Sequence, residues 1–303
     1  MLGRLRRIAG VVGVAFGGLL PVSPAQAGQG VCLLLSDSGG VYQTTAETLA
    51  RELGRNGGDW QITTATLGDY AANGSDLTVA IGTEALKLAL AQPDRPVLSL
   101  LVPRQTYERL AAGRQRVTAL YLDQPLSRQM RLLAVALPEL TKAGAPLGPV
   151  SRGLRPALRS AARDTGIALD TAVIEEGTDL YGALNELAED SQAFVLLPDP
   201  VVMKPGTLQN FFLHTYRLKK PVLAYSAPLV QSGAMLALYT TPAQQGREAA
   251  GWISESWGGG EFRFGAPRYP RLFAIGVNRS VARSLGIALP SEDVLSQRLE
   301  AAQ

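Results

Sequence analysis

The chain has 303 residues, of which 46% are hydrophobic and 18% charged, enough to build one large or two medium cores. Its formal net charge of +3 comes from Arg4, Arg6 and Arg7, because the remaining basic residues equal the 26 acidic ones. That balance argues against a nucleic-acid-binding surface. The only cysteine, Cys32, excludes an internal disulfide, and its apolar neighbours predict a buried thiol.

Residues 1–27 have the features of an export signal. The three arginines precede a charge-free stretch over residues 8–20, which Pro21 and Pro24 end. Ala25-Gln26-Ala27 then places small residues at a signal-peptidase site. An apolar stretch of about 13 residues is short for a helix that must cross roughly 30 Å of hydrocarbon. We expect cleavage after Ala27 and a periplasmic mature chain; an uncleaved anchoring or amphipathic helix is the alternative.

From residue 31 onward, short apolar runs alternate with loops and amphipathic helical segments. In the first half we expect strands over 31–35, 77–81 and 97–102, and helices over 42–53, 82–90 and 106–111. In the second half we expect strands over 145–150, 167–173, 194–197 and 221–225, and helices over 126–137, 154–165, 180–188 and 208–218. Strands that alternate with helices indicate parallel sheets covered on both faces. Continuously apolar strands agree with that arrangement.

The number of strand–helix units predicts two α/β lobes, each a doubly wound parallel sheet, with an interdomain cleft between them. The predicted N-terminal lobe comprises residues 28–121 plus about 236–258. The predicted C-terminal lobe comprises residues 122–235 plus about 259–303. Hinge segments are expected at residues 121–124, near Ala234 and at residues 258–261.

Ligands of open parallel sheets bind at the C-terminal ends of the strands, which here would face the cleft. The candidate ligand-binding residues in these loops are Ser36, Asp37, Ser38, Gly39, Tyr42, Gly82, Thr83, Arg104, Ser151, Asp199, Tyr225 and Ser226. The serines and glycine at residues 36–39 precede a helix, whose free N–H groups favour an anion; a simple helix cap is the alternative. Tyr42 and Tyr225 would supply aromatic walls.

Two charged residues allow two interpretations each. Asp199, between Pro198 and Pro200, either pairs with an amine of the ligand or caps the turn that follows it. Arg104 either holds a ligand carboxylate through two parallel hydrogen bonds or is an exposed arginine after Pro103.

The sequence offers no catalytic constellation. The only histidine, His214, lies in an apolar helical stretch, and we expect it to be half-buried on that helix. The sequence contains no G-x-S-x-G motif. Glu175, Glu176 and Asp179 have the oxygen ligands that a hard cation needs. We interpret them instead as an acidic loop that faces the solvent. No G-x-G-x-x-G motif or P-loop follows a strand. We therefore expect neither enzymatic activity nor a cofactor or bound metal.

Several short segments together resemble the ABC transporter substrate-binding family with the type I periplasmic-binding-protein fold, the group that includes tryptophan/tyrosine-type transporters. The segments that carry the resemblance, in chain order, are residues 80–85 (AIGTEA), 96–98, 137–138, 168–169, 196–199 (LLPD), 220–222, 230–234 (VQSGA) and 275–287 (IGVNRSVARSLGI). The chain departs from the family at Val102-Pro103-Arg104, where a polar and acidic turn is expected. We therefore carry no amino-acid specificity over from the family.

The resemblance implies a monomeric periplasmic solute-binding protein that closes two lobes around a small-molecule ligand and delivers it to an inner-membrane ABC permease. A second hypothesis is that the protein has the same fold but serves as a sensory or partner-binding module of the cell envelope, without a role in transport. A third, a periplasmic enzyme, requires His214 in the cleft beside an acid or a nucleophile.

Overall fold

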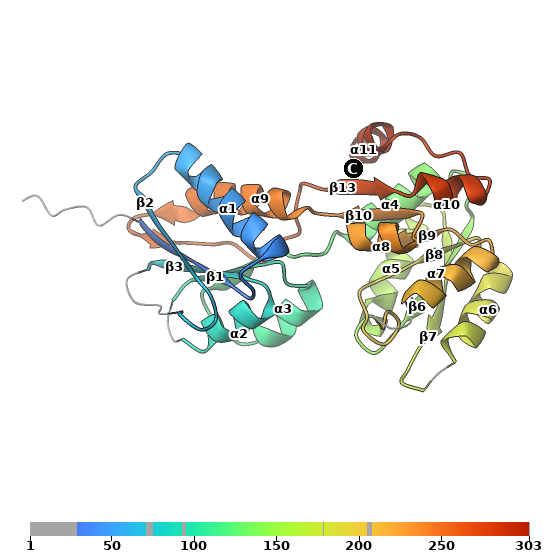
Figure 1. The fold of residues 1–303 in the computed structure, drawn as a ribbon, viewed down its shortest axis with the longest axis horizontal. Coiled ribbons are helices and arrows are strands. Elements are labelled where there is room, and N and C mark those ends of the chain that lie inside the picture. The colour runs from blue at the N-terminus through green and yellow to red at the C-terminus, as the bar shows by residue number, and fades with distance from the viewer. Residues whose placement is uncertain (1–28, 71–74, 93–94, 178, 205–207, 303) are drawn as a thin grey trace, which may run out of the picture.

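The computed structural model describes residues 29–70, 75–92, 95–177, 179–204 and 208–302. Figure 1 shows two lobes that lie side by side along the longest axis of the molecule. Each lobe has its own sheet with helices on both faces, which confirms the predicted fold class. Among the described residues, no helix is both long and apolar enough to cross a membrane. The predicted leader, residues 1–27, lies outside the described part of the chain.

The N-terminal lobe is built on a five-stranded parallel sheet in the order β2-β1-β3-β4-β5. Its strands are β1 (Gln29–Leu35), β2 (Trp60–Ala65), β3 (Leu77–Ile81), β4 (Val97–Leu100) and β5 (Val117–Ala119). The central strands β3 and β4 are buried along their full lengths. The two edge strands, β2 and β5, are not among the strands predicted from the sequence. Edge position explains this, since β2 is exposed at three of its six residues and β5 is only three residues long.

Helices cover both faces of this sheet and enclose two cores. The helices are α1 (Gly40–Arg55), α2 (Thr83–Leu90), α3 (Arg104–Leu110) and α9 (Pro242–Ser256). On one face α1 and α9 pack around Leu33, Leu49 and Ile253, and on the other α2 and α3 pack around Leu34 and Leu86. Cys32 is buried within the sheet, as predicted.

The C-terminal lobe is built on a six-stranded sheet in the order β13-β10-β9-β8-β6-β7, in which only β13 is antiparallel to its neighbour. Its strands are β6 (Lys142–Leu147), β7 (Ala168–Val173), β8 (Ala193–Val195), β9 (Val222–Ala224), β10 (Leu236–Tyr239) and β13 (Ala274–Val277). Most of these strands are short, apolar and buried, as expected for a sheet covered on both faces. β7 is the more exposed of the two edges.

The helices of this lobe also form two layers. They are α4 (Leu126–Ala136), α5 (Arg155–Arg163), α6 (Leu180–Asp190), α7 (Leu208–Arg217), α8 (Ala227–Ser232), α10 (Arg279–Ser284) and α11 (Glu292–Ala301), with a short 3-10 turn, η1 (Arg152–Leu154), before α5. One core lies between the sheet and α4, α5, α10 and α11. The other lies between the sheet and α6, α7 and α8.

The structure corrects two expected lobe boundaries. Residues 236–239 were assigned to the N-terminal lobe, but β10 pairs with β9 and β13 in the C-terminal sheet. Residues 259–262 were assigned to the C-terminal lobe. The hairpin of β11 (Trp257–Gly258) and β12 (Glu261–Phe262) instead follows α9, and Phe262 packs into the N-terminal core. Because β10 pairs with β9, the chain returns to the N-terminal lobe only after β10.

Three segments therefore connect the lobes: residues 120–125, 240–241 and 263–273. The first agrees with the expected hinge, whereas the expected hinges near Ala234 and at residues 258–261 are replaced by the other two. The buried Gln124 joins all three crossings. Its Nε2 donates to Thr240 Oγ1 and, at 3.2 Å, to the carbonyl oxygen of Leu272.

Candidate functional site

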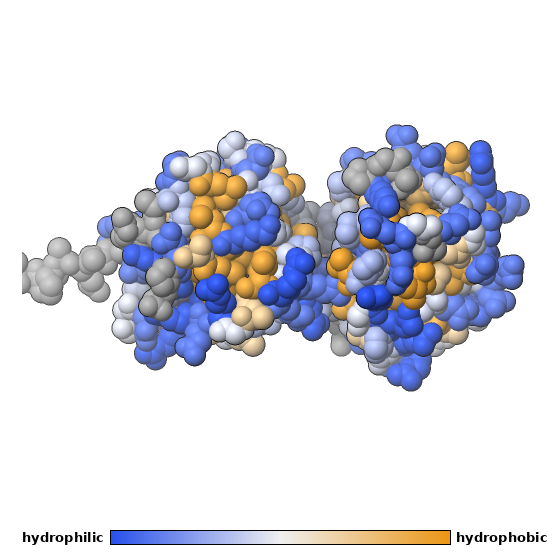
Figure 2. All heavy atoms as spheres, turned by 90° about the horizontal axis from the view of Figure 1, so that it is seen from below, coloured by the Kyte–Doolittle hydropathy of each residue, from blue (hydrophilic) through white to orange (hydrophobic). Residues whose placement is uncertain are grey.

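A cleft of about 490 Å³ lies between the lobes, close to the crossing segments. Figure 2 shows the two lobes as separate masses joined by a narrower waist. The N-terminal lobe contributes the start of α3, and the C-terminal lobe contributes the loops after β6, β8 and β9. The lining residues are Pro103, Arg104, Gln105, Thr106, Arg109, Asp123, Gln124, Leu126, Gln129, Val150, Leu154, Leu197, Pro198, Asp199, Pro200, Met203, Tyr225 and Tyr269. The volume suits a small organic ligand.

Arg104 is held in place by three partners at the N-terminal side of the cleft. Its backbone N donates to Asp123 Oδ2 at 2.5 Å, its Nε to Glu108 Oε1 at 2.7 Å and its Nη1 to the Tyr269 hydroxyl at 2.8 Å. The guanidinium carbon also lies 5.7 Å from the centre of the Tyr269 ring. The hydrogen bonds to Tyr269 and Glu108 raise the pKa of Arg104. The cleft therefore contains an oriented, permanently positive group.

Asp123 lies in the first crossing and faces the same cleft. Burial raises the pKa of the Asp123 carboxyl, although the hydrogen bond from the Arg104 backbone and the charge of Arg104 act in the opposite direction. The ionised form is thus less favourable in the folded chain than in the unfolded one.

This shift predicts a pH-dependent effect of Asp123→Asn. The stability that accompanies protonation of Asp123 is fully present below the ordinary carboxyl pKa of about 4 and is lost as the pH rises through the raised pKa. The asparagine variant keeps an acceptor for the Arg104 backbone and carries no charge. We expect it to be more stable than the wild type at pH 7, with the gap closing toward pH 4, as measured by urea unfolding. A gap that is equal at both pH values would contradict the assignment.

Asp199 ties together two loops at the C-terminal side of the cleft and is only 3% exposed. Its Oδ2 accepts from the backbone N of Val150 at 3.0 Å, and from the backbone N and Oγ of Ser151 at 2.8 and 3.0 Å. Its Oδ1 accepts from the backbone N of Val201 at 3.0 Å. Of the two interpretations from sequence, these four donors favour the turn cap over pairing with an amine.

Gly148 makes this arrangement possible. A Cβ atom at residue 148 would lie 2.2 Å from Asp199 Oδ1, closer than any real contact. The predicted site residue Ser151 is fully buried behind Asp199, and its hydroxyl also accepts from the backbone N of Gly148 at 3.0 Å. The Ser151 hydroxyl therefore contacts the cleft only through Asp199.

Tyr225 follows β9 and lines the cleft, as the sequence predicts for a strand end. Burial, and then the charge of Asp199, raise the pKa of the Tyr225 hydroxyl. The side chain is therefore a neutral aromatic wall with a hydrogen-bonding end. The neighbouring Ser226 is the N-cap residue of α8, and its side chain makes no capping hydrogen bond.

The seven predicted site residues of the first two loops form a separate cluster in the N-terminal lobe: Ser36, Asp37, Ser38, Gly39, Tyr42, Gly82 and Thr83. They lie at the ends of β1 and β3, and none is among the described residues that line the cleft. Ser36 Oγ accepts from the backbone N of Ala85 at 2.9 Å and so caps α2. Asp37 Oδ1 accepts from the backbone N of Gly39 at 3.0 Å, which closes the loop on itself.

Gly82 is required for this cluster to pack. Its φ of +98° favours glycine, and a Cβ atom there would lie 2.5 Å from both Ser36 Oγ and Tyr42 Cε1. Ser36 and Tyr42 thus pack the loop between β1 and α1 against the end of β3. For Ser36 the geometry favours the capping interpretation, although the helix that it caps is α2 and not the one that follows it.

Sequence reasoning did not identify several residues that line the cleft. They include Gln105, Thr106, Arg109, Asp123, Gln124, Gln129, Met203 and Tyr269. Asp123 and Gln124 had a usable signal, because they lie in the predicted crossover before Pro125. Tyr269 had none, since it lies in the third crossing and reaches Arg104 from 165 residues away.

His214 and the acidic loop lie outside the cleft. His214 is on α7, where its Nε2 is 3.0 Å from Asn185 Oδ1 and its ring centre 5.1 Å from that of Tyr181. Glu175 pairs with Arg152 at 3.2 Å, and Asp179 caps α6 through the backbone N of Tyr181. In the described ranges, no group of three histidine, cysteine or acidic residues is placed to hold a metal ion. The geometry that the enzyme hypothesis requires is therefore not found around His214.

Residues 50–301 match the family model described as ABC transporter substrate binding protein. The chain belongs to this family. The match confirms the resemblance inferred from the short segments, and it supports a solute-binding role. A comparison with curated proteins gives no match.

Solved structures of this class share the fold at low identity. An ABC domain from Streptococcus pneumonia in complex with L-Trp is 17% identical with a TM-score of 0.61, over 89% of this chain and 98% of that one. The ligand-free, open structure of a substrate-binding protein with adhesive properties from Clostridium difficile is 17% identical with a TM-score of 0.70, over 88% and 97%. An ABC transporter substrate-binding protein from Desulfitobacterium hafniense in complex with Leu is 14% identical with a TM-score of 0.57, over 83% and 97%.

Proposed function

We propose that the chain is the solute-binding component of an ABC importer, which holds a small molecule between its lobes and delivers it to an inner-membrane permease. The observation that carries this proposal is the cleft between the lobes. Arg104 lines it from one lobe and the loops after β6, β8 and β9 line it from the other. Membership in the substrate-binding family supports the same role.

The chemistry of the cleft favours a ligand with an anionic group and an apolar body. Arg104 and Arg109 supply positive charge on the N-terminal side. Leu197, Met203 and Tyr225 supply an apolar and aromatic wall on the C-terminal side. The Asp199 carboxylate already accepts four hydrogen bonds from its own loops, so it is a poor partner for a ligand ammonium group.

Lobe closure would couple binding to transport. A ligand between the lobes contacts both of them only when they approach, so it shifts an open–closed equilibrium toward the closed form. The crossings that must bend are residues 120–125, 240–241 and 263–273, with Gln124 at their centre. A permease would then recognise the paired lobe surfaces of the closed form.

We also propose that the protein is exported and works in the periplasm as a monomer, with Gly28 as the first mature residue. The arginines, apolar stretch and Ala25-Gln26-Ala27 at the N-terminus support this proposal.

Ligand binding is tested by thermal unfolding of the chain from Gly28 with a panel of small carboxylates, amino acids, nucleobases and vitamins. A ligand at 100 times its Kd stabilises by about 2.7 kcal/mol, a shift of several degrees. We expect a saturable shift with an aromatic or aliphatic carboxylate. Arg104→Gln should weaken binding roughly 10- to 100-fold by calorimetry, since it removes a charge-assisted hydrogen bond. Arg51→Gln, at an exposed arginine of α1, is the matched control.

A sensory or partner-binding module is the second candidate. Arg104 and Asp199 already have internal partners, which reduces the polar groups that a ligand can use. A folded protein that shows no shift with any member of the panel would favour this module over transport. Equal ligand affinity of the wild type and Arg104→Gln would instead refute the anionic-ligand proposal.

A further inference from the structure

The groove beside α5 carries positive charge that has no partner. Arg155, Arg159 and Arg163 follow one another at intervals of four residues and line a groove of about 540 Å³ with Pro156 and Leu169. Within the described part of the chain, none of these three guanidinium groups makes a hydrogen bond or ion pair. Arg155 Nε is buried without a hydrogen-bond partner. We call this feature the α5 groove; it shares no residue with the interlobe cleft.

Leu169 of β7, the open edge strand of the C-terminal sheet, lines the α5 groove. β7 is the last strand in the order and pairs only with β6 among the described strands. The backbone N of Ala168 and that of Ile174 each donate at 2.8 Å to carbonyl oxygens at the two ends of β6. Because successive amides of a strand point in opposite directions, the N–H groups of Leu169, Thr171 and Val173 face away from β6. The edge thus offers donors and acceptors to another strand.

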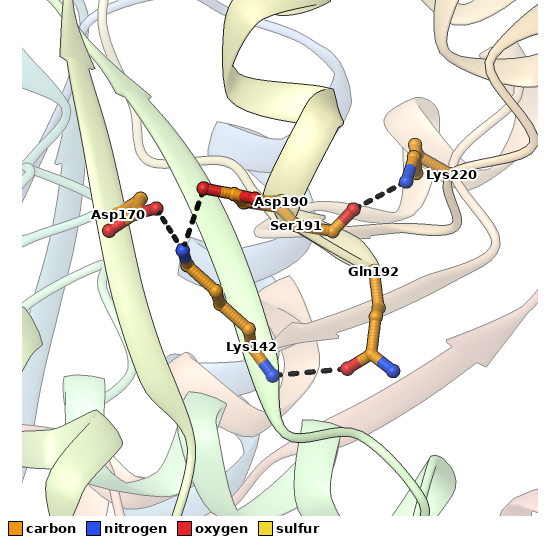
Figure 3. Close-up of polar contacts among 6 residues, drawn as sticks. All are labelled: Lys142, Asp170, Asp190, Ser191, Gln192 and Lys220. Atoms are coloured by element: carbon orange, nitrogen blue, oxygen red, sulfur yellow. Dashed lines mark hydrogen bonds and ion pairs between the residues drawn. The ribbon is translucent and has the colours of Figure 1, made fainter.

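The opposite face of this edge carries two carboxylates and one lysine, so its charge is net negative. Figure 3 shows Asp170 of β7 and Asp190 of α6 converging on Lys142 of β6. The Lys142 Nζ lies 2.7 Å from Asp170 Oδ2 and 3.2 Å from Asp190 Oδ2. Since Leu169 lines the α5 groove, the neighbouring Asp170 points to the other face. Among the described residues, positive charge without a partner therefore lies on the α5 side of β7, and the other side is net negative.

The spacing of the arginines fits an added strand. Four residues of an α-helix rise about 6 Å, and two residues of a strand rise about 6.6 Å. A strand paired with β7 would place every second side chain on the α5 side, so acidic residues at alternate positions would meet successive arginines. Arginine also binds carboxylates through two parallel hydrogen bonds.

We propose that the α5 groove binds an extended segment of a partner protein, with acidic residues at alternate positions, as a seventh strand beside β7. Backbone hydrogen bonds to the edge supply one part of the interaction and the three arginines supply the other, as in other cases of strand addition. A flat anionic membrane would match the charge but would not pair with the strand edge, which is why the structure favours a peptide.

The probe is a fluorescein-labelled eight-residue peptide that alternates Glu and Thr, titrated with the chain from Gly28 and followed by fluorescence anisotropy. We expect saturable binding that weakens with added salt. A peptide of equal composition in two blocks, four Glu followed by four Thr, should bind at least tenfold more weakly. The alternating peptide with N-methylated amides should also bind at least tenfold more weakly, because it cannot pair along one edge.

Protein variants separate the two contributions. The triple variant Arg155→Gln, Arg159→Gln and Arg163→Gln should lose at least tenfold in affinity for the alternating peptide. A matched control removes the same charge from three exposed arginines elsewhere, Arg247, Arg283 and Arg298, and should bind as the wild type does. Thr171→Pro removes one outward N–H without touching the pairs to β6 and should weaken binding by a similar factor.

The outcomes decide the proposal even if Thr171→Pro does not fold, because the N-methylated peptide tests strand pairing on the wild-type protein. Equal loss of affinity in the α5 triple variant and its control would overturn a specific site. Equal binding of the block and alternating peptides would overturn strand addition. So would absence of peptide binding together with binding to vesicles of phosphatidylglycerol and phosphatidylcholine, which would assign the arginines to a membrane surface.

Discussion

Replacement of Asp199 by alanine should lower the free energy of unfolding by about 3 kcal/mol and the Tm by roughly 6–12 °C. The variant removes the acceptor of three backbone N–H groups, those of Val150, Ser151 and Val201, in a nearly closed environment. Each buried donor without an acceptor costs about 1–3 kcal/mol, and water from the cleft recovers part of that. Chemical unfolding followed by circular dichroism measures the change.

Asp170→Ala is the matched control for this prediction. Asp170 is a partly exposed carboxylate of the same lobe, and its ion pair with Lys142 lies at the surface. Its removal should cost less than about 1 kcal/mol. A similar loss in the two variants would show that Asp199 does not hold the loops together. Should Asp199→Ala keep its stability and lose ligand affinity alone, the amine-binding interpretation would replace the loop-closing one.

Gly246→Ala should destabilise the N-terminal lobe by about 2–3 kcal/mol. Gly246 lies on α9 where that helix crosses α1, and a Cβ atom there would lie 2.6 Å from the carbonyl oxygen of Thr45 and 3.0 Å from the backbone N of Leu49. Both contacts are backbone atoms on the buried face of α1, so the helices must separate to accept a methyl group. Guanidinium unfolding, followed by tryptophan fluorescence because Trp252 and Trp257 lie in or beside this core, measures the loss.

The same helix supplies the control. Gly251 also lies on α9, but a Cβ atom there meets nothing within 4 Å. Gly251→Ala should therefore stabilise the lobe by about 0.5–1 kcal/mol, through helix propensity alone. If both alanine variants gain stability, the close approach of α1 and α9 is not present in solution.

In the N-terminal lobe, the strands that the sequence predicted are the buried ones. Buried central strands such as β3 and β4 are continuous apolar runs and were predicted within two residues. The edge strand β2 carries exposed polar residues and was missed. In this sheet, local pattern therefore indicated the inner strands better than the edges. In the C-terminal sheet it did not, because the exposed edge β7 was predicted and the buried β10 was not.

The candidate site shows a similar division. The topology of open parallel sheets predicted that strand ends would face the cleft, and Arg104, Asp199 and Tyr225 do line it. The loops after β1 and β3 have the same local pattern, yet their residues pack on one another and cap α2. The residue composition of a loop does not determine whether its side chains pack within the lobe or line the cleft.

The sequence by itself determined the α/β class, the alternation of strands and helices, the balanced charge of the chain after its first 27 residues and the resemblance to the substrate-binding family. These properties depend on local periodicity, composition and short motifs. Only the tertiary structure decided that β10 joins the C-terminal sheet and that Asp199 closes two loops. It also decided that Gln124 joins three crossings. The Asp199 and Gln124 contacts join residues 48 to 148 positions apart, and no local pattern encodes them.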